Sequence, residues 1–198
     1  MNEKHPLPKT ANITVVHREI RDTAVRSHRE MLRLESEPPA EIRFESGPAS
    51  TEVLHFFETK QLSQMYSRVV QVFSLLAVEA FLNEYGYLRF SREVFEKKYD
   101  RLPLHKKLAS MLGDAVGNFD PESEIAALAK TLAERRNRLV HPKPELEVWN
   151  DDCSKSQTTK RLPRVDAEPA TAALEEMDRF FELFAVIDQH AAFILSPS

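Results

Sequence analysis

The stretch that decides the fold is VVQVFSLLAVEAFL, residues 69–82. Its apolar residues recur at intervals of three and four, and Gln71 and Glu79 are its strongly polar members. This spacing is typical of a helix, because about 3.6 residues make one turn. Its first apolar face carries Leu62, Met65, Tyr66, Val69, Phe73, Leu76 and Ala80, and its second carries Val72, Leu75 and Val78. We therefore predict a central helix that is buried nearly all round.

The predicted central helix begins near Thr51 or Leu62 and ends at Tyr85, with Gly86 as its C-terminal cap. Its apolar run is shorter than the roughly 20 residues that a membrane-spanning helix needs. The first residues, MNEKHPLPKT, lack the apolar segment and the small-residue cleavage site of a secretory signal. We therefore expect a cytoplasmic protein without a membrane contact.

Periodic apolar residues on both sides of the central helix predict further helices. They span residues 16–34, 91–99, 104–112, 121–141 and 169–194. Gly113 is the predicted end of the third of these segments, and Asp120 followed by Pro121 is the predicted start of the fourth. Pro142 should end that helix near His141, because a residue before proline avoids helical geometry. The expected fold class is all-α, an antiparallel bundle of four to five main helices.

The 198 residues suit one domain with an extension, because a chain of this length builds one hydrophobic core. Residues 1–50 are the expected extension: an arm, an amphipathic helix with an arginine-rich polar side, and a linker rich in Pro, Glu and Ser. The apolar stripe of that helix is thin, which fits packing on the bundle, on a second subunit or only loosely. Residues 51–198 are the expected bundle, within which the polar, aperiodic residues 142–165 predict a long loop or a small hairpin.

The net charge of −4 hides a basic central segment. Residues 86–164 carry a formal charge of +4, whereas residues 165–198 carry −6. The clustered cations of the central segment are Lys97, Lys98, Arg101, Lys106, Lys107, Lys130, Arg135, Arg136, Arg138 and Lys143. Such a cluster can bind a polyanion by releasing counterions, although a solvated helical face has the same composition.

Several kinds of site are excluded by composition. Cys153 is the one cysteine, so an internal disulfide framework and a multi-thiolate zinc site are ruled out. The seven histidines are dispersed, and the four glycines form no G-x-x-x-x-G-K-[ST] or G-x-G-x-x-G loop. We therefore expect no metal and no cofactor. The acidic pairs 151–152 and 175–176 are interpreted as solvated charge.

The segment with the clearest chemistry is ERRNRLVHP, residues 134–142. Arg136 lies four residues after Leu132, on or beside the stripe that should face the core. A buried guanidinium needs a carboxylate or a bound anion. Glu79, a lone carboxylate in the central helix, is the expected partner, and Asn83 shares its face one turn later. A structural ion pair that sets helix register remains the alternative for this pair.

His141 lies at the C-terminal end of the same helix, where the helix dipole favours the protonated imidazolium. A histidine there can exchange protons near neutral pH or can simply cap the helix. Asn137 is its polar neighbour one turn earlier. Arg136 and His141 are five residues apart, about 140° around an ideal helix, so one straight helix does not bring them together. Unwinding before Pro142, the reach of the arginine, or a second copy across a dimer interface would do so.

The string RNRLVH, residues 136–141, resembles the R-x4-6-H signature of the HEPN superfamily of helical bundles. The surroundings are also similar over about residues 62–194: a long apolar helix ending in LLAVEAFLNEYG, a short helix containing LPLHKKLASML, the motif helix and a last apolar helix. The resemblance implies a HEPN-like bundle that usually dimerises. In many members it also implies a metal-independent endoribonuclease of toxin–antitoxin or phage-defence systems, in which the RNA 2′-hydroxyl attacks the adjacent phosphate and leaves a cyclic phosphate.

On this resemblance, His141 would be the general acid or base, Arg136 would hold the phosphate, and Asn137 would assist. The residues expected to support this site are Glu79 and Asn83, and those expected to bind RNA are Arg135, Arg138 and Lys143. The expected partners are RNA, an antitoxin protein, and a second copy that meets the first near the motif helices. The alternative function is a non-catalytic HEPN-like module for dimerisation or for binding a partner or nucleotide, with a structural Arg136 and a capping His141.

Overall fold

The computed structural model describes residues 16–36, 51–117, 119–140 and 166–195. These residues form α1 (Val16–Ser36), α2 (Thr51–Phe90), α3 (Arg92–Lys98), α4 (Leu104–Val116), α5 (Glu124–Val140), α6 (Ala167–Ile187) and α7 (Gln189–Leu195). They contain no β-strand, so the predicted all-α class is confirmed for this part of the chain. The loop or hairpin predicted over residues 142–165 lies outside the described residues.

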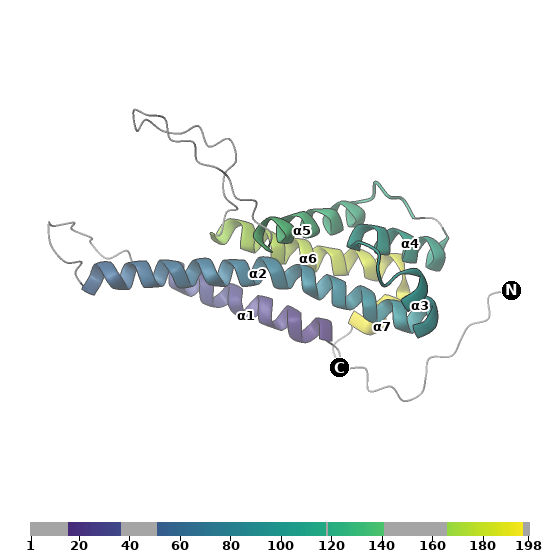
Figure 1. Ribbon diagram of the computed structural model, residues 1–198, viewed down its shortest axis with the longest axis horizontal. Coiled ribbons are helices and arrows are strands. Elements are labelled where there is room, and N and C mark those ends of the chain that lie inside the picture. The colour runs from purple at the N-terminus through teal and green to yellow at the C-terminus, as the bar shows by residue number, and fades with distance from the viewer. Residues whose placement is uncertain (1–15, 37–50, 118, 141–165, 196–198) are drawn as a thin grey trace, which may run out of the picture.

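α2 is the central helix of the bundle and contacts every other helix that the structure describes. α1 runs along one side of α2, and α5 and α6 run along the other side (Figure 1). The short helices α3, α4 and α7 gather around the C-terminal end of α2. The N-terminal turns of α2 extend beyond the ends of α5 and α6. The two halves of α2 therefore have different surroundings.

α1 packs antiparallel to α2 and is bonded to it near both ends. The backbone N–H of His17 donates to Glu84 Oε1 at 3.3 Å, and His17 Nδ1 lies 2.7 Å from Glu84 Oε2. At the other end, the Ser63 hydroxyl donates to Glu35 Oε1 at 3.0 Å. Of the alternatives left open for this amphipathic helix, the structure therefore shows packing on the bundle.

The main hydrophobic core surrounds the C-terminal half of α2. Phe81 and Tyr85 meet the ring of Phe184 of α6 edge-on, with ring centroids 5.0 and 4.9 Å apart. Such aromatic contacts stabilise beyond the burial of area alone. The short helices and α5 complete this core with Phe95, Leu108, Met111, Leu112 and Leu132. A second cluster, nearer the N-terminal half of α2, holds only three fully buried residues: Met31, Val70 and Ala170.

The inner side of α2 is polar in its N-terminal half. Its buried residues there include Ser63, Ser67, Gln71 and Ser74. The Ser67 hydroxyl donates to the Asp166 carbonyl at 2.8 Å, and Gln71 Nε2 donates to Ser67 Oγ at 3.2 Å. Hydrogen bonds thus supplement the small apolar contact of Val53 and Val70 here, whereas apolar packing dominates the other half.

The opposite side of α2 is largely apolar, and we call it the outer face. Its apolar residues, none of which belongs to either hydrophobic cluster, are Leu54, Phe57, Leu62, Met65, Val69, Val72 and Leu76. Its exposed polar residues are Glu58, Gln61 and Arg68. The prediction that α2 is buried nearly all round is therefore wrong. The physical reason is that α1 and the pair α5 and α6 cover two sides of α2 and leave the outer face open, and that α5 and α6 do not reach its first turns.

Among the described residues, α2 is the one helix long and apolar enough to cross a membrane by length and composition. Half of its most apolar 18-residue window is buried inside the bundle, and core helices of soluble proteins pass the same test. The absence of a membrane contact stays a prediction.

The predicted ends of two helices are wrong because two glycines serve other purposes. α2 continues through Gly86 to Phe90. A Cβ on Gly86 would lie 2.2 Å from Cδ2 of Phe95, so this glycine lets α3 approach the helix closely. α4 likewise continues past Gly113, and its cap is Gly117, whose positive φ of 88° favours glycine.

Two further boundaries differ from the prediction. Asp120 does not cap α5, because its carboxylate accepts the backbone N–H of Glu122 in a turn and α5 begins at Glu124. The predicted last helix is broken into α6 and α7 at Asp188, which has extended backbone geometry. The Asp188 carboxylate accepts the Tyr85 hydroxyl of α2 at 2.5 Å, so this buried contact fixes the break.

Candidate functional site

α5 carries the motif on the last turns of a helix whose first turns lie in the core. Ile125, Ala129 and Leu132 of α5 are buried. Arg136 follows Leu132 by four residues and continues the same side, where it is half-buried, as its position in the stripe predicted. The structure describes α5 as far as Val140, so the predicted helix end near His141 stays a prediction. The candidate residues His141 and Lys143 lie outside the described residues.

Arg136 uses little of its hydrogen-bonding capacity on the described residues. Its Nη1 donates to Oδ1 of the adjacent Asn137 at 3.0 Å. Within the described ranges, its buried Nε has no hydrogen-bond partner and its guanidinium forms no ion pair. The structure thus brings together two of the three predicted catalytic residues, and the described part of the chain leaves donors of this guanidinium available for an anion.

The motif segment does form a largely buried ion pair, but through Arg135 instead of Arg136. Arg135 Nη2 lies 2.7 Å from Oε1 of Glu176 on α6, and Arg135 Nη1 donates to the Pro169 carbonyl at 2.9 Å. The two side chains expose only 20% and 21% of their surface. Arg135 therefore fastens the end of α5 to α6, which leaves little of it for the predicted RNA contact.

The expected pair of Glu79 with Arg136 does not form, and the helix register gives the reason. Ser67 of α2 and Arg135 of α5 both bond to backbone carbonyls at the start of α6. The end of α5 is therefore level with Ser67. Glu79 lies three turns further along α2, a distance of about 18 Å along the helix.

The predicted supporting residues serve a different helix. Asn83 Oδ1 accepts a hydrogen bond from Lys107 Nζ of α4 at 2.7 Å, and this ammonium also lies 5.4 Å from the centroid of Phe95. Burial lowers the pKa of Lys107, and the carboxylates of Asp100 and Glu79 oppose that shift. Glu79 and Asn83 thus stabilise a buried lysine instead of the motif arginine.

The roles of Glu176 and Lys107 were not predicted, although each residue lies at helical spacing from an apolar residue of the core. Glu176 was interpreted as solvated charge, yet it lies three residues after the buried Ala173. Lys107 lies three residues after the buried Leu104 and was counted only as part of a basic cluster. A charged residue at helical spacing from core residues is a candidate buried charge.

Burial raises the pKa of Glu176, and the nearby Arg135 guanidinium only partly opposes this effect. The second carboxylate oxygen, Oε2, is buried without a hydrogen-bond partner among the described residues. Arg135 Nε is likewise buried without a hydrogen-bond partner among these residues. The two side chains lie close together, but each has a buried polar atom without a hydrogen bond to a described residue. Such an environment favours the protonated form of the Glu176 carboxyl.

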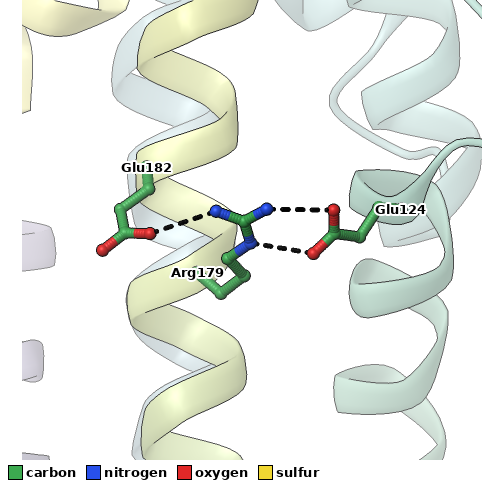
Figure 2. A network of polar contacts seen from close by, with 3 residues as sticks. All are labelled: Glu124, Arg179 and Glu182. Carbon is green, nitrogen blue, oxygen red and sulfur yellow. Dashed lines mark hydrogen bonds and ion pairs between the residues drawn. The ribbon is translucent and has the colours of Figure 1, made fainter.

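A second arginine joins α5 to α6 near the start of α5. Figure 2 shows Arg179 of α6 between Glu124 of α5 and Glu182 of its own helix. Its Nε and Nη2 donate to the two carboxylate oxygens of Glu124 at 2.8 and 3.1 Å, and Nη1 donates to Glu182 at 3.4 Å. Arg179 and Glu124 expose 48% and 55% of their side chains. We call these two ion pairs clamps. The exposed Arg179–Glu124 clamp and the mostly buried Arg135–Glu176 clamp hold α5 against α6 near both ends of α5.

The basic residues of the central segment lie at two ends of the molecule. Arg138 is 73% exposed and is 3.7 Å from Glu134 of its own helix, so it remains accessible to RNA. Lys97, Arg101 and Lys106 are exposed around α3 and α4, at the opposite end of the bundle from the end of α5. Within the described residues, the cations therefore form no single surface around the motif.

The described residues contain no group of three His, Cys, Asp or Glu side chains placed to hold a metal ion. No protein-family model, curated protein or solved structure matches this chain.

Proposed function

We propose that the chain is a metal-independent endoribonuclease of HEPN type, with a HEPN-like arrangement of its helices. Arg136 would hold the phosphate and stabilise its charge in the transition state, His141 would transfer protons, and Asn137 would orient the arginine. The RNA 2′-hydroxyl would attack the adjacent phosphate and release a 5′-hydroxyl fragment, which leaves a 2′,3′-cyclic phosphate. These roles need fixed cationic donors and a titratable imidazole.

The observation that carries the proposal is the state of Arg136. It is half-buried at the end of a well-packed helix, it bonds to Asn137, and its Nε has no partner among the described residues. A guanidinium held in this way is positioned for an anion, and an RNA phosphate fits that requirement. His141 follows the last described residue of α5, Val140, directly in the sequence.

The wider setting follows from the resemblance and is part of the proposal. The protein would act in the cytoplasm as a homodimer in which the motif ends of the two copies approach each other. An antitoxin protein would restrain it in a toxin–antitoxin or phage-defence system. Arg138 and Lys143 would contact the RNA backbone, where each cation adds to the salt dependence of binding.

The test compares wild type, His141→Ala and Arg136→Ala on end-labelled single-stranded RNA in EDTA. Arg92→Ala is the matched control, because Arg92 is exposed at the far end of the bundle and pairs only with Glu96 of its own helix. We expect cleavage with cyclic phosphate ends from wild type and from the control. Both motif variants should lose at least about 100-fold in rate while they keep the wild-type melting curve.

RNA left intact by folded wild type, or cleavage that persists in His141→Ala, would contradict the proposal. Cleavage lost only together with the fold of Arg136→Ala would identify a structural arginine. In that case His141→Ala decides the matter, because this substitution leaves Arg136 and every other described residue of α5 unchanged.

A non-catalytic helical module for self-association or partner binding is the second candidate. The outer face of α2 favours it, because a row of apolar side chains away from the core is typical of an interaction surface. In that case neither motif substitution would change RNA turnover, and the outer face would carry the function.

A further inference from the structure

The N-terminal half of α2 exposes large apolar side chains while it buries several polar ones. Leu54, Phe57, Leu62 and Met65 of its outer face expose 54%, 49%, 45% and 45% of their surface. At 100° per residue, Met65 points about 160° away from Ser63 and Ser67, which are buried. Small polar residues thus lie inward beside the buried Val53 and Val70, and large apolar residues lie toward solvent.

This arrangement is unfavourable for an isolated chain. Each large apolar side chain loses stabilisation of about 25 cal/mol for every Å² that stays in water. Single exposed apolar residues are common on protein surfaces, but several along one side of a helix mark an interaction surface, even though the exposed Glu58 and Gln61 lie among them here. Half-buried Val69 and Val72 continue the row toward the middle of α2.

We propose that the outer face of α2 binds the same face of a second copy of this chain, with the two α2 helices antiparallel. The first turns of α2 extend beyond α5 and α6, so no described helix blocks a second α2 there (Figure 1). The contact is carried by α2 itself and is an alternative to the contact between motif helices that the resemblance implies. It does not depend on ribonuclease activity.

The charges on the outer face select the antiparallel arrangement. Glu58 and Arg68 are the two charged residues on this face between residues 54 and 76, and both are exposed without an ion pair to any described residue. A two-fold axis at the level of residue 63 brings Glu58 of one copy opposite Arg68 of the other, and does so twice. A parallel pair would instead align Glu58 with Glu58, and like charges at an interface are repulsive.

The same axis also matches the apolar residues. It places Leu54 opposite Val72 and Phe57 opposite Val69 of the second copy, with Met65 near the centre. The contact is then isologous, as in most homodimers, because each pair of residues occurs twice. An apolar row with one charge pair on each side of its centre fits the general composition of such interfaces.

The first experiment measures the mass of the full chain by sedimentation equilibrium over a wide range of concentration. We expect a monomer–dimer equilibrium for wild type. Met65→Glu should raise the dimer dissociation constant at least about 100-fold, because a carboxylate would be buried at the centre of the contact. Val186→Glu is the matched control: Val186 of α6 is 82% exposed, so the same charge placed there should leave the dimer unchanged.

The second experiment reverses the charges one at a time and together. Glu58→Arg and Arg68→Glu should each weaken the dimer about tenfold or more, because each creates two like-charge contacts. The double variant should restore the dimer, because it re-forms both pairs with reversed sign. Circular dichroism melts show that every variant is folded.

A monomeric wild type at every concentration would overturn the proposal, as would binding to lipid vesicles or to another protein without self-association. A dimer that persists in Met65→Glu would move the contact to another surface. Failure of the double charge reversal to restore the dimer would overturn the register at residue 63. RNA cleavage enters none of these measurements, so this inference and the proposed activity stand or fall separately.

Discussion

The two ends of the contact between α5 and α6 are held by the same kind of ion pair in different surroundings. Near the start of α5, Arg179 binds both oxygens of Glu124 with the better hydrogen-bond geometry, but the pair is about half exposed. Near the end, Arg135 reaches one oxygen of Glu176, and the pair is four-fifths buried. The Arg179–Glu124 pair therefore has the better geometry, whereas the Arg135–Glu176 pair is the better shielded from solvent.

The comparison shows which property decides the energetic consequence. Water competes for both partners of an exposed pair, so its loss costs little even when the geometry is good. A buried pair contributes little net stability when it is intact, but the loss of one partner leaves a charge that water cannot reach. We expect the less regular clamp at the motif end to be the more sensitive one.

The largest expected effect comes from Arg135→Met. This substitution keeps the apolar stem, leaves Glu176 buried without its cation and removes the bond to the Pro169 carbonyl. We expect the free energy of unfolding to fall by about 3 kcal/mol, at the lower end for a buried pair because a fifth of each side chain is exposed. Thermal and urea unfolding followed by circular dichroism measure it.

Arg179→Met, which makes the same chemical change at the exposed clamp, is the control for this prediction. Equal losses of stability in the two variants would show that exposure does not separate the clamps.

The next effect is a pH dependence of opposite sign at the two clamps. The pKa of Glu176 is raised by burial, so the stability that it contributes is full below its ordinary value of 4.5 and is lost as pH rises through the raised pKa. The pKa of Glu124 is lowered by Arg179, so its contribution is present above 4.5 and is lost as pH falls through the lowered pKa.

Glu176→Gln and Glu124→Gln test these signs. Relative to wild type, Glu176→Gln should become steadily more favourable as pH rises from about 4.5 to neutrality, because glutamine does not ionise. Glu124→Gln should cost most near neutrality, and its cost should shrink as pH falls below 4.5. Urea unfolding at a series of pH values gives both curves. Parallel curves would show that the two carboxylates share one environment.

The smallest effect is expected for Arg179→Met itself. Loss of the Arg179 guanidinium should lower the melting temperature only slightly. Added salt should reduce even this difference, because ions screen exposed charges. Melting curves of variant and wild type at low and high salt measure the difference. A large, salt-independent shift would mean that the clamp shown in Figure 2 is protected from water.

Sequence periodicity could predict that α1, α2, α5 and α6 exist, because apolar residues at helical spacing depend only on local geometry. It could also place Arg136 on the core-facing side of α5, which the half-buried guanidinium confirms. It failed at Gly86, where a signal for a helix end proved to be a point of close approach to Phe95. The role of a glycine depends on which residue comes near it, and local sequence does not contain that information.

The partners of the candidate site residues depended on register. Arg136 and Glu79 looked complementary, because each is a lone charge in an apolar stripe. The packing of α5, which runs antiparallel to both α2 and α6, instead gave Glu176 to Arg135, and Glu79 came to lie near the buried Lys107. A shift of one or two turns between two helices changes every such pair, and the local spacing of one helix leaves that shift undetermined.

The sequence by itself determined the helical class of the described chain, the main amphipathic segments and the RNRLVH motif, because each depends on residues close together in the chain. Tertiary structure alone decided which side of α2 is covered, which arginine is paired and where the last helix breaks. These outcomes depend on the order and register in which helices pack. Buried charges and exposed apolar rows appear only after that packing is set.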